Sequence, residues 1–229
     1  CDDCPAGGFC AAIGAASARQ TFEACPAGTF NPDRGNSSSD ACHACAPGKA
    51  NPIPGSWNAS VCLDCLPGSR APAAGSATCE LCAPGTFMNE SGKTACFDCA
   101  AGSYCEQGAS APLPCKEGSF SSALGLGSHD QCTSCPAGSS CSTGALPHKL
   151  CSPGAVQPER GHKDCADCVA GKFISTTGNT ACDDCTPGYL CVEGSSAPQP
   201  CRGGTHANQT VLNLTGFLSS LEQIKHIHN

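Results

Sequence analysis

Cysteine is the residue type that offers the most chemistry in this chain of 229 residues. The chain contains 24 cysteines, and they include eight C-x-x-C pairs. A thiolate can ligate zinc or attack a disulfide, and two thiols can be oxidised to a crosslink. Cys42, Cys45, Cys62 and Cys65 have the spacing of a four-thiolate zinc site. Three types of chemistry therefore have to be compared: metal binding, redox catalysis and structural crosslinking.

Structural crosslinking accounts for more of the cysteines than the two alternatives. Cys10, Cys105, Cys141 and Cys191 lie outside every C-x-x-C pair, whereas structural zinc needs its ligands in groups of four. A thioredoxin-like redox motif needs a β-α-β pattern around it, and none surrounds these pairs. We therefore expect no metal and no cofactor, and we interpret the cysteines as disulfides formed on an oxidising secretory route.

The composition predicts that disulfides replace a hydrophobic core. Leu, Ile, Val and Phe together make up only 31 residues, well below the roughly 20% that a chain needs to bury enough apolar surface. Cysteine accounts for about a tenth of the residues, which is the density of a disulfide scaffold. We expect an extracellular or cell-surface, secreted protein.

A short motif built on cysteine and glycine recurs along the chain. In twelve repeats a Gly lies three residues after the opening Cys, and a Pro often comes one or two residues before that Gly. A Pro and Gly so placed predict a type II turn, in which the Gly adopts a positive φ. An aromatic residue frequently follows two residues later, as at Phe30 and Phe87. The glycines are Gly7, Gly28, Gly48, Gly68, Gly85, Gly102, Gly118, Gly138, Gly154, Gly171, Gly188 and Gly204.

Seven of these repeats form predicted disulfide loops. A second Gly lies ten residues after the opening Cys, and a closing Cys follows with 13 or 16 residues between the two cysteines. Each loop contributes about 3 kcal/mol in the chain-entropy model, and the segment inside it has room for a small two-stranded ribbon. The predicted loops are Cys25–Cys42, Cys45–Cys62, Cys65–Cys79, Cys82–Cys96, Cys115–Cys132, Cys151–Cys165 and Cys168–Cys182.

Eight further cysteines have five residues between possible partners. Spacing leaves the connectivity open, since four cysteines such as Cys99, Cys105, Cys115 and Cys132 admit three pairings. The local pairing is preferred because it leaves the seven loops intact. It joins Cys4 to Cys10, Cys99 to Cys105, Cys135 to Cys141 and Cys185 to Cys191.

The motifs C-P-A-G-T-F at Cys25 to Phe30 and C-A-P-G-T-F at Cys82 to Phe87 resemble the ephrin-receptor-like cysteine-rich repeat. That repeat is similar to the first submodule of tumour-necrosis-factor-receptor domains. The resemblance covers residues 1–205 and implies small disulfide-rich repeats in an elongated rod, with short β-ribbons, irregular loops and little core. It also implies that the first and second Cys of each loop pair.

The last segment of the chain differs in character from the repeats. Residues 206–229 contain no Cys, and Leu214, Phe217, Leu218 and Leu221 fall at helical spacing. We expect this tail to be partly helical, as a short C-terminal helix.

Several function classes find no support in the sequence. No G-x-S-x-G, phosphate-binding loop or H-E-x-x-H motif is present, so we do not expect an enzyme. The net charge of −7 and the absence of basic runs argue against nucleic-acid binding. No apolar run approaches the 18 or so residues of a membrane span.

Five N-glycosylation sequons predict N-linked glycans, at Asn36, Asn58, Asn89, Asn208 and Asn213.

These observations predict an extracellular structural glycoprotein that is a protomer of a filament or surface coat. Cys1 and Cys201 have no local partner, so we expect head-to-tail self-association through an intermolecular bridge between them, or pairing with another extracellular protein. Two alternatives remain open. The chain could be a ligand-binding receptor ectodomain fragment, or the C-x-x-C pairs could bind zinc.

Overall fold

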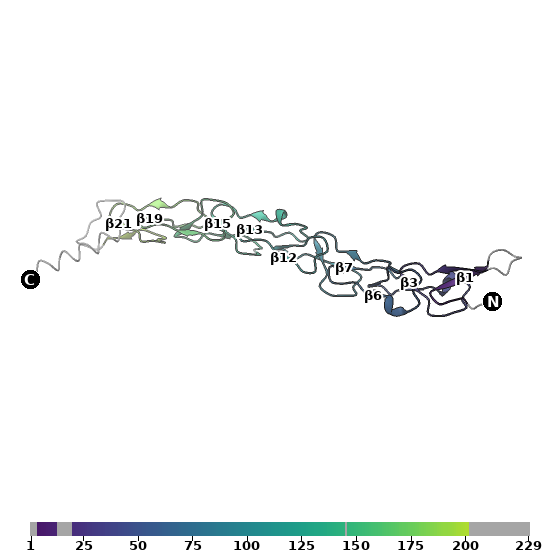
Figure 1. Cartoon of the computed structure of the whole chain (residues 1–229). Helices are drawn as coiled ribbons and strands as arrows, with labels where there is room; N and C mark the ends of the chain where they lie inside the picture. The colour runs from purple at the N-terminus through teal and green to yellow at the C-terminus, as the bar shows by residue number, and fades with distance from the viewer. Residues whose placement is uncertain (1–3, 13–19, 145, 202–229) are drawn as a thin grey trace, which may run out of the picture. The chain divides into compact units, whose positions relative to one another are not determined.

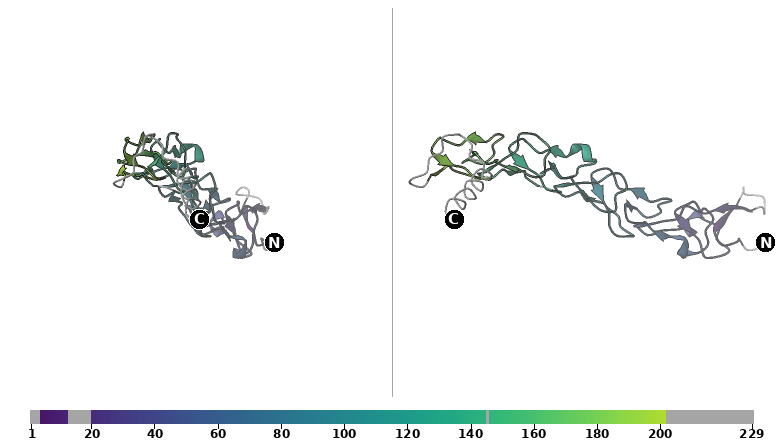
Figure 2. Two further views of the ribbon diagram at one scale, coloured as in Figure 1. Left: turned by 90° about the vertical axis from the view of Figure 1, so that its left-hand side faces the viewer. Right: turned by 60° about the vertical axis from the view of Figure 1, so that its left-hand side comes forward.

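The computed structural model describes residues 4–12, 20–144 and 146–201. The chain divides into two compact units. The first unit holds residues 1–113 and 123–131, and the second unit holds residues 114–122 and 132–229. Within each unit the repeats follow one another in single file, as Figure 1 and the right-hand view of Figure 2 show.

The described chain consists of short strands, turns and three one-turn 3₁₀ helices, and it contains no α-helix. The strands form eleven two-stranded sheets of neighbouring segments, which confirms the expected small ribbons. The strands are β1(Gly8–Ala12), β2(Gln20–Ala24), β3(Thr29–Phe30), β4(His43–Ala44), β5(Lys49–Ala50), β6(Leu63–Asp64), β7(Ser69–Arg70), β8(Glu80–Leu81), β9(Thr86–Phe87), β10(Phe97–Asp98), β11(Ser103–Tyr104), β12(Leu113–Pro114), β13(Ser119–Phe120), β14(Thr133–Ser134), β15(Ser139–Ser140), β16(Lys149–Leu150), β17(Ala155–Val156), β18(Ala166–Asp167), β19(Lys172–Phe173), β20(Asp183–Asp184), β21(Tyr189–Leu190) and β22(Gln199–Pro200).

The disulfides join the same 22 cysteines that the spacing paired. Seven close the long loops and four close the six-residue separations, with Cα atoms 5.5 to 5.9 Å apart. Among the described cysteines, only Cys201 has no disulfide partner. Cys1 and the tail from residue 206 lie outside the described residues.

Each repeat begins with the predicted turn. In the repeat that opens at Cys25, the Thr29 amide donates to the Pro26 carbonyl at 3.1 Å, which closes a four-residue turn. Gly28 occupies the third position of that turn with φ of +89°, the conformation of a type II turn. The ribbon β3–β4 follows, with Phe30 opposite His43. The centroids of their two rings are 5.8 Å apart.

Two loop lengths occur because some loops carry an additional 3₁₀ turn. The three disulfide loops with a separation of 17 contain η1(Ser39–Ala41), η2(Ala59–Val61) and η3(His129–Gln131), whereas the loops with a separation of 14 have none. Asn58 caps η2, since its Oδ1 accepts from the Ser60 amide at 2.9 Å. The three additional residues thus form one 3₁₀ turn before the closing Cys, which is capped by a side chain in η1 and η2.

The apolar core is as small as the composition predicts. The buried side chains are mostly cysteines, and the apolar clusters hold only a few residues each. One cluster contains Ala50, Cys65 and Ala71, and another contains Val156, Cys168 and Ile174. Such clusters bury too little apolar surface to hold the chain together alone, so the disulfides and the main-chain hydrogen bonds carry the fold.

Candidate functional site: the junction between repeats

The most regular feature of the molecule is the set of main-chain hydrogen bonds between successive repeats. Each repeat is named here by its opening cysteine. The turn glycine of one repeat uses both of its peptide groups on the next repeat. In the Cys25 repeat, the Gly28 amide donates to the Asn51 carbonyl at 2.7 Å, and the Gly28 carbonyl accepts from the Cys45 amide at 2.9 Å.

Two more hydrogen bonds complete the same junction. The Gly55 amide donates to the Cys25 carbonyl at 2.8 Å, and the Asn31 amide donates to the Ser56 carbonyl at 2.9 Å. Four main-chain bonds therefore join the Cys25 repeat to the Cys45 repeat. All four depend on the backbone, so the side chains of a repeat can vary while the junction is kept.

The second unit repeats the same junction with other residues. Between the Cys135 and Cys151 repeats, the Gly138 amide donates to the Gln157 carbonyl at 2.7 Å, and the Gly161 amide donates to the Cys135 carbonyl at 2.9 Å. The Cys151 amide donates to the Gly138 carbonyl at 2.9 Å, and the Cys141 amide donates to the His162 carbonyl at 3.1 Å. The same four groups are used in both units.

Eight repeats also come close to the repeat after the next in the same unit. A Cβ added to Gly28 would lie 2.0 Å from the carbonyl oxygen of Gly75, which belongs to the Cys65 repeat. In the second unit, a Cβ on Gly118 would lie 2.0 Å from the carbonyl oxygen of Gly161. The turn glycine is thus required twice, by its positive φ and by this close approach of two backbones.

The residue six positions after the opening cysteine is buried in every described repeat. Between successive repeats of one unit, its carbonyl accepts the hydrogen bond from the turn glycine of the preceding repeat, as Asn51 does from Gly28. Four repeats place a cysteine there, and it pairs with the opening cysteine. The others place Asn31, Asn51, Ala71, Met88, Ser121, Gln157 or Ile174. The two disulfide patterns are therefore variants of one repeat.

Moving a cysteine to this sixth position is expected to change the disulfide pattern and keep the fold. In the variant Met88→Cys with Cys96→Ala, Cys82 should pair with the new thiol, because Cys105 pairs with Cys99 from the same position. Non-reducing peptide mapping would detect the new pair. A free thiol at Cys82 or position 88 in secreted protein would contradict the equivalence. Met88→Ser with Cys96→Ala is the matched control, which leaves Cys82 unpaired.

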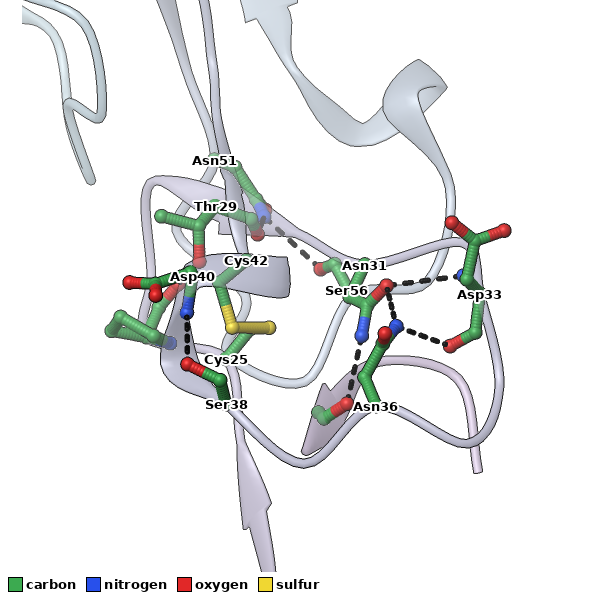
Figure 3. The surroundings of a disulfide bond; sticks show 12 residues. Cys25, Thr29, Asn31, Asp33, Asn36, Ser38, Asp40, Cys42, Asn51 and Ser56 are labelled. Carbon is green, nitrogen blue, oxygen red and sulfur yellow. Dashed lines mark hydrogen bonds between the residues drawn. A yellow bond between two sulfur atoms is a disulfide. The ribbon is translucent and has the colours of Figure 1, made fainter. Parts of the chain in front are cut away.

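Asparagine at the sixth position adds side-chain bonds to the junction. Asn31 is fully buried, and its Nδ2 donates to the Gly8 carbonyl of the preceding repeat at 2.8 Å. Its Oδ1 accepts from the Asp33 amide at 3.1 Å and from Asn36 Nδ2 at 3.2 Å, as Figure 3 shows. Asn51 has the same role in the Cys45 repeat, where its Nδ2 donates to the Thr29 carbonyl at 3.0 Å.

Removing the Asn51 amide is expected to destabilise the first unit. Asn51→Ala leaves the half-buried Thr29 carbonyl and the Ile53 amide, which donates to Asn51 Oδ1 at 3.0 Å, without these partners. We expect a loss of about 2–4 kcal/mol in the free energy of unfolding, measured by denaturant titration. Asn89→Ala, made in unglycosylated protein, is the control because Asn89 is exposed and should change stability by less than about 0.5 kcal/mol. Equal effects of the two changes would contradict this role.

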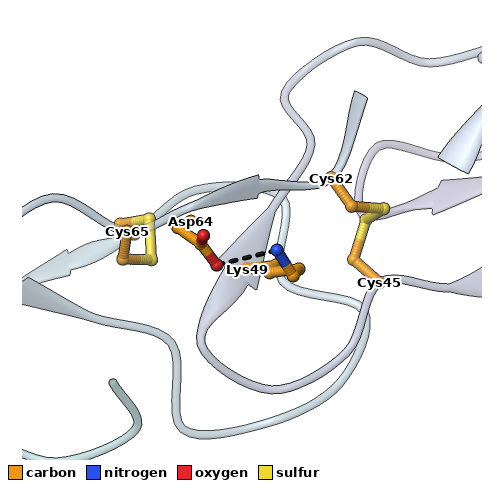
Figure 4. A network of polar contacts seen from close by, with 6 residues as sticks. Cys45, Lys49, Cys62, Asp64 and Cys65 are labelled. Carbon is orange, nitrogen blue, oxygen red and sulfur yellow. Dashed lines mark hydrogen bonds and ion pairs between the residues drawn. A yellow bond between two sulfur atoms is a disulfide. The ribbon is translucent and has the colours of Figure 1, made fainter. Parts of the chain in front are cut away.

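Ion pairs on the ribbons add little to the junction. Lys49 of β5 contacts Asp64 of β6 at 2.7 Å, between two disulfides (Figure 4), and Lys172 of β19 contacts Asp184 of β20 at 2.5 Å. The Lys49 and Asp64 side chains are 40% and 54% exposed. Exposed pairs contribute at most about 1 kcal/mol, so these charges do not decide how the repeats stack.

The cysteines with zinc-like spacing are all placed in disulfides. Cys42 pairs with Cys25, Cys45 with Cys62, and Cys65 with Cys79, so the four sulfurs belong to three different crosslinks. A paired sulfur offers no thiolate to a metal. Within the described ranges, no group of three or more metal-ligating side chains comes together.

Other predicted features are only partly described by the structure. Asn36, Asn58 and Asn89 lie in loops of the first unit, whereas Asn208 and Asn213 lie outside the described residues. Among the residues that the structure describes, no helix has the length and apolar character needed to cross a bilayer.

Neither a protein-family model nor a curated protein sequence matches this chain.

Proposed function

We propose that this protein is an extracellular structural glycoprotein, a protomer of a filament or surface coat built from ephrin-receptor-like repeats. The observation that carries the proposal is the junction of four main-chain hydrogen bonds, repeated in both units with different side chains. Such a junction propagates a spacing and leaves the outward side chains free to vary. The eleven disulfides are consistent with an extracellular or secreted protein.

The proposed assembly joins protomers head to tail. Cys201 stands at the place of an opening cysteine, because its amide donates to the Gly188 carbonyl at 3.2 Å as other opening cysteines do to the preceding turn glycine. It is half-buried and has no disulfide partner among the described residues. We propose that it bridges to Cys1 of the next protomer, and such heterologous contacts propagate when they do not close into a ring.

Electron microscopy and light scattering of the secreted full chain test this function. We expect filaments or oligomers under oxidising conditions, and smaller species for Cys201→Ser. Ser195→Ala is a control change on a side chain of the last described repeats. A protein that stays monomeric at all concentrations in both forms would contradict the protomer proposal.

A receptor ectodomain is the second candidate, and exposed apolar side chains favour it. Ile53, Trp57, Leu63 and Leu66 of the first unit are 60 to 72% exposed. Exposed apolar patches mark interaction sites, and Trp is enriched among the residues that contribute most to binding. A monomeric chain that captures a soluble protein ligand, and loses the capture on Trp57→Ala, would favour this function over the coat protomer.

A further inference from the structure

The three described sequons differ in what the asparagine amide does in the folded chain. Asn36 is half-buried, and its Nδ2 donates to Asn31 Oδ1 at 3.2 Å and to the Asp33 carbonyl at 3.4 Å (Figure 3). An amide nitrogen has two protons to donate, so both protons of Asn36 are engaged. The nitrogen that a glycan would occupy already belongs to the hydrogen-bond network of the fold.

By contrast, the side-chain amide nitrogens of Asn58 and Asn89 make no hydrogen bond within the described residues. Both residues are exposed. Asn58 uses only its Oδ1, which accepts from the Ser60 amide at 2.9 Å, so its Nδ2 has no hydrogen-bond partner among the described residues. Asn89 makes no side-chain hydrogen bond within those residues. A sugar on either nitrogen would replace no contact of the fold.

The hydroxyl residue of each sequon shows the same difference. Ser38, the third residue of the Asn36 sequon, caps η1 because its Oγ accepts from the Asp40 amide at 3.2 Å. The hydroxyl groups of Ser60 and Ser91, which complete the other two sequons, make no hydrogen bond within the ranges that the structure describes. Two separate groups of the Asn36 sequon are therefore held by the folded repeat.

Asn36 is also tied to the junction with the preceding repeat. Its partner Asn31 is fully buried and donates to the Gly8 carbonyl, and the Asn36 carbonyl accepts from the Cys10 amide at 2.9 Å. Turning the Asn36 side chain outward to accept a glycan would break its hydrogen bonds to Asn31 and to the Asp33 carbonyl, and Asn31 is the side chain that bonds to the preceding repeat. Of the three described sequons, only this one carries that cost.

We propose that Asn58 and Asn89 carry N-linked oligosaccharide, whereas closure of the Cys25 repeat withholds Asn36 from the same transfer. The proposal rests on the extracellular function given above, because it needs a lipid-linked glycosyl diphosphate donor. In the transfer, a bond forms between Nδ2 and the anomeric carbon, the nitrogen loses a proton, and the bond from that carbon to the diphosphate breaks. The lipid diphosphate is the leaving group.

The proposal predicts which region of the molecule is covered by carbohydrate. The two acceptor repeats, Cys45 and Cys82, are next-but-one neighbours in direct contact, since a Cβ on Gly48 would lie 2.1 Å from the Gly92 carbonyl oxygen. The sequence from 114 to 201 contains no sequon. Carbohydrate is therefore expected on the Cys45 and Cys82 repeats of the first unit, whereas residues 114–201 carry no N-linked glycan.

Translation of the full chain, preceded by a cleavable secretion signal, in the presence of microsomal membranes tests the proposal. The reaction is run with and without dithiothreitol, which prevents the Cys25–Cys42 disulfide, and site occupancy is measured by enzymatic deglycosylation in ¹⁸O water and mass spectrometry. Without reductant, we expect occupancy at Asn36 to be about tenfold below that at Asn58 and Asn89, as loss of two hydrogen bonds implies. With reductant, all three sites should become similarly occupied.

Each other outcome overturns a defined claim. Equal occupancy of Asn36 and Asn58 without reductant overturns the inference and leaves the proposed function intact. Low occupancy of Asn36 under both conditions also overturns it, because the fold would not be the cause. No glycan at any of the three sites under either condition contradicts the proposed function itself, and the inference with it.

Discussion

Gly28→Ala is expected to destabilise the first unit and disrupt its repeat junction, whereas Gly35→Ala in the same repeat is expected to be tolerated. Both glycines have a positive φ, of +89° and +77°, so both substitutions carry a backbone penalty of about 1–2 kcal/mol. Only Gly28 also meets another backbone, since its added Cβ would lie 2.0 Å from the Gly75 carbonyl oxygen. Nothing lies within 4 Å of a Cβ on Gly35. The pair therefore separates the effect of close packing from that of conformation.

We expect Gly28→Ala to cost at least about 4 kcal/mol, a size that single substitutions reach only when a structure cannot relax around them. Hydrogen exchange should show lost protection at the Gly28, Cys45 and Gly55 amides, which form the junction. Gly35→Ala should keep that protection. If both variants behave alike, this would contradict the close contact between Gly28 and the Gly75 carbonyl.

Reduction of all disulfides is expected to unfold the entire described chain. One loop of 14 to 17 residues contributes about 3 kcal/mol, and a whole domain is typically stable by only about 5–15 kcal/mol. The apolar clusters, such as that of Val156, Cys168 and Ile174, are too small to replace the crosslinks. After reduction and alkylation, the amide NMR spectrum should lose its dispersion and the hydrodynamic radius should increase.

The control for this experiment is alkylation without reduction, which leaves the crosslinks intact. Partial reduction should open most of the long loops first, because six of their seven closing cysteines, such as Cys42 and Cys79, are half-buried. In the pair Cys99–Cys105 both cysteines are fully buried. A reduced chain with a native spectrum would show that a core, and not the disulfides, holds the fold.

The local features of the repeat were predictable from the sequence. Cysteine spacing predicts loops such as Cys25–Cys42, and a glycine three residues after a cysteine predicts the turn with positive φ. These features depend on residues close together in the chain, and glycine, proline and cysteine have strong and specific conformational preferences.

The contacts between repeats could not be predicted in the same way. The approach of Gly28 to Gly75 joins residues 47 positions apart and depends on how the loops stack, which no local preference determines. The second glycine of the short-pair repeats, such as Gly108, lies nine residues after the opening cysteine and was missed because the loops with a closing cysteine place it at ten. The shared role of Met88 and Cys105 required the stacked repeats to be seen.

The difference among the three described sequons was also beyond the sequence. Asn36, Asn58 and Asn89 look equivalent as sequons, yet only Asn36 is bonded to a buried residue of the repeat junction. The difference arises because Asn31 is buried at the junction with the preceding repeat, where it bonds to Gly7 and Gly8, which is a consequence of stacking and not of the sequon itself.

Non-reducing peptide mapping of the native protein tests the central claim most directly. The claim is that one repeat, with two disulfide patterns, builds the described chain. We predict eleven crosslinks, including Cys25–Cys42, Cys45–Cys62 and Cys65–Cys79 of the long pattern and Cys99–Cys105 of the short one. Free thiols at Cys42, Cys45, Cys62 and Cys65, or stoichiometric zinc bound to the chain, would contradict it.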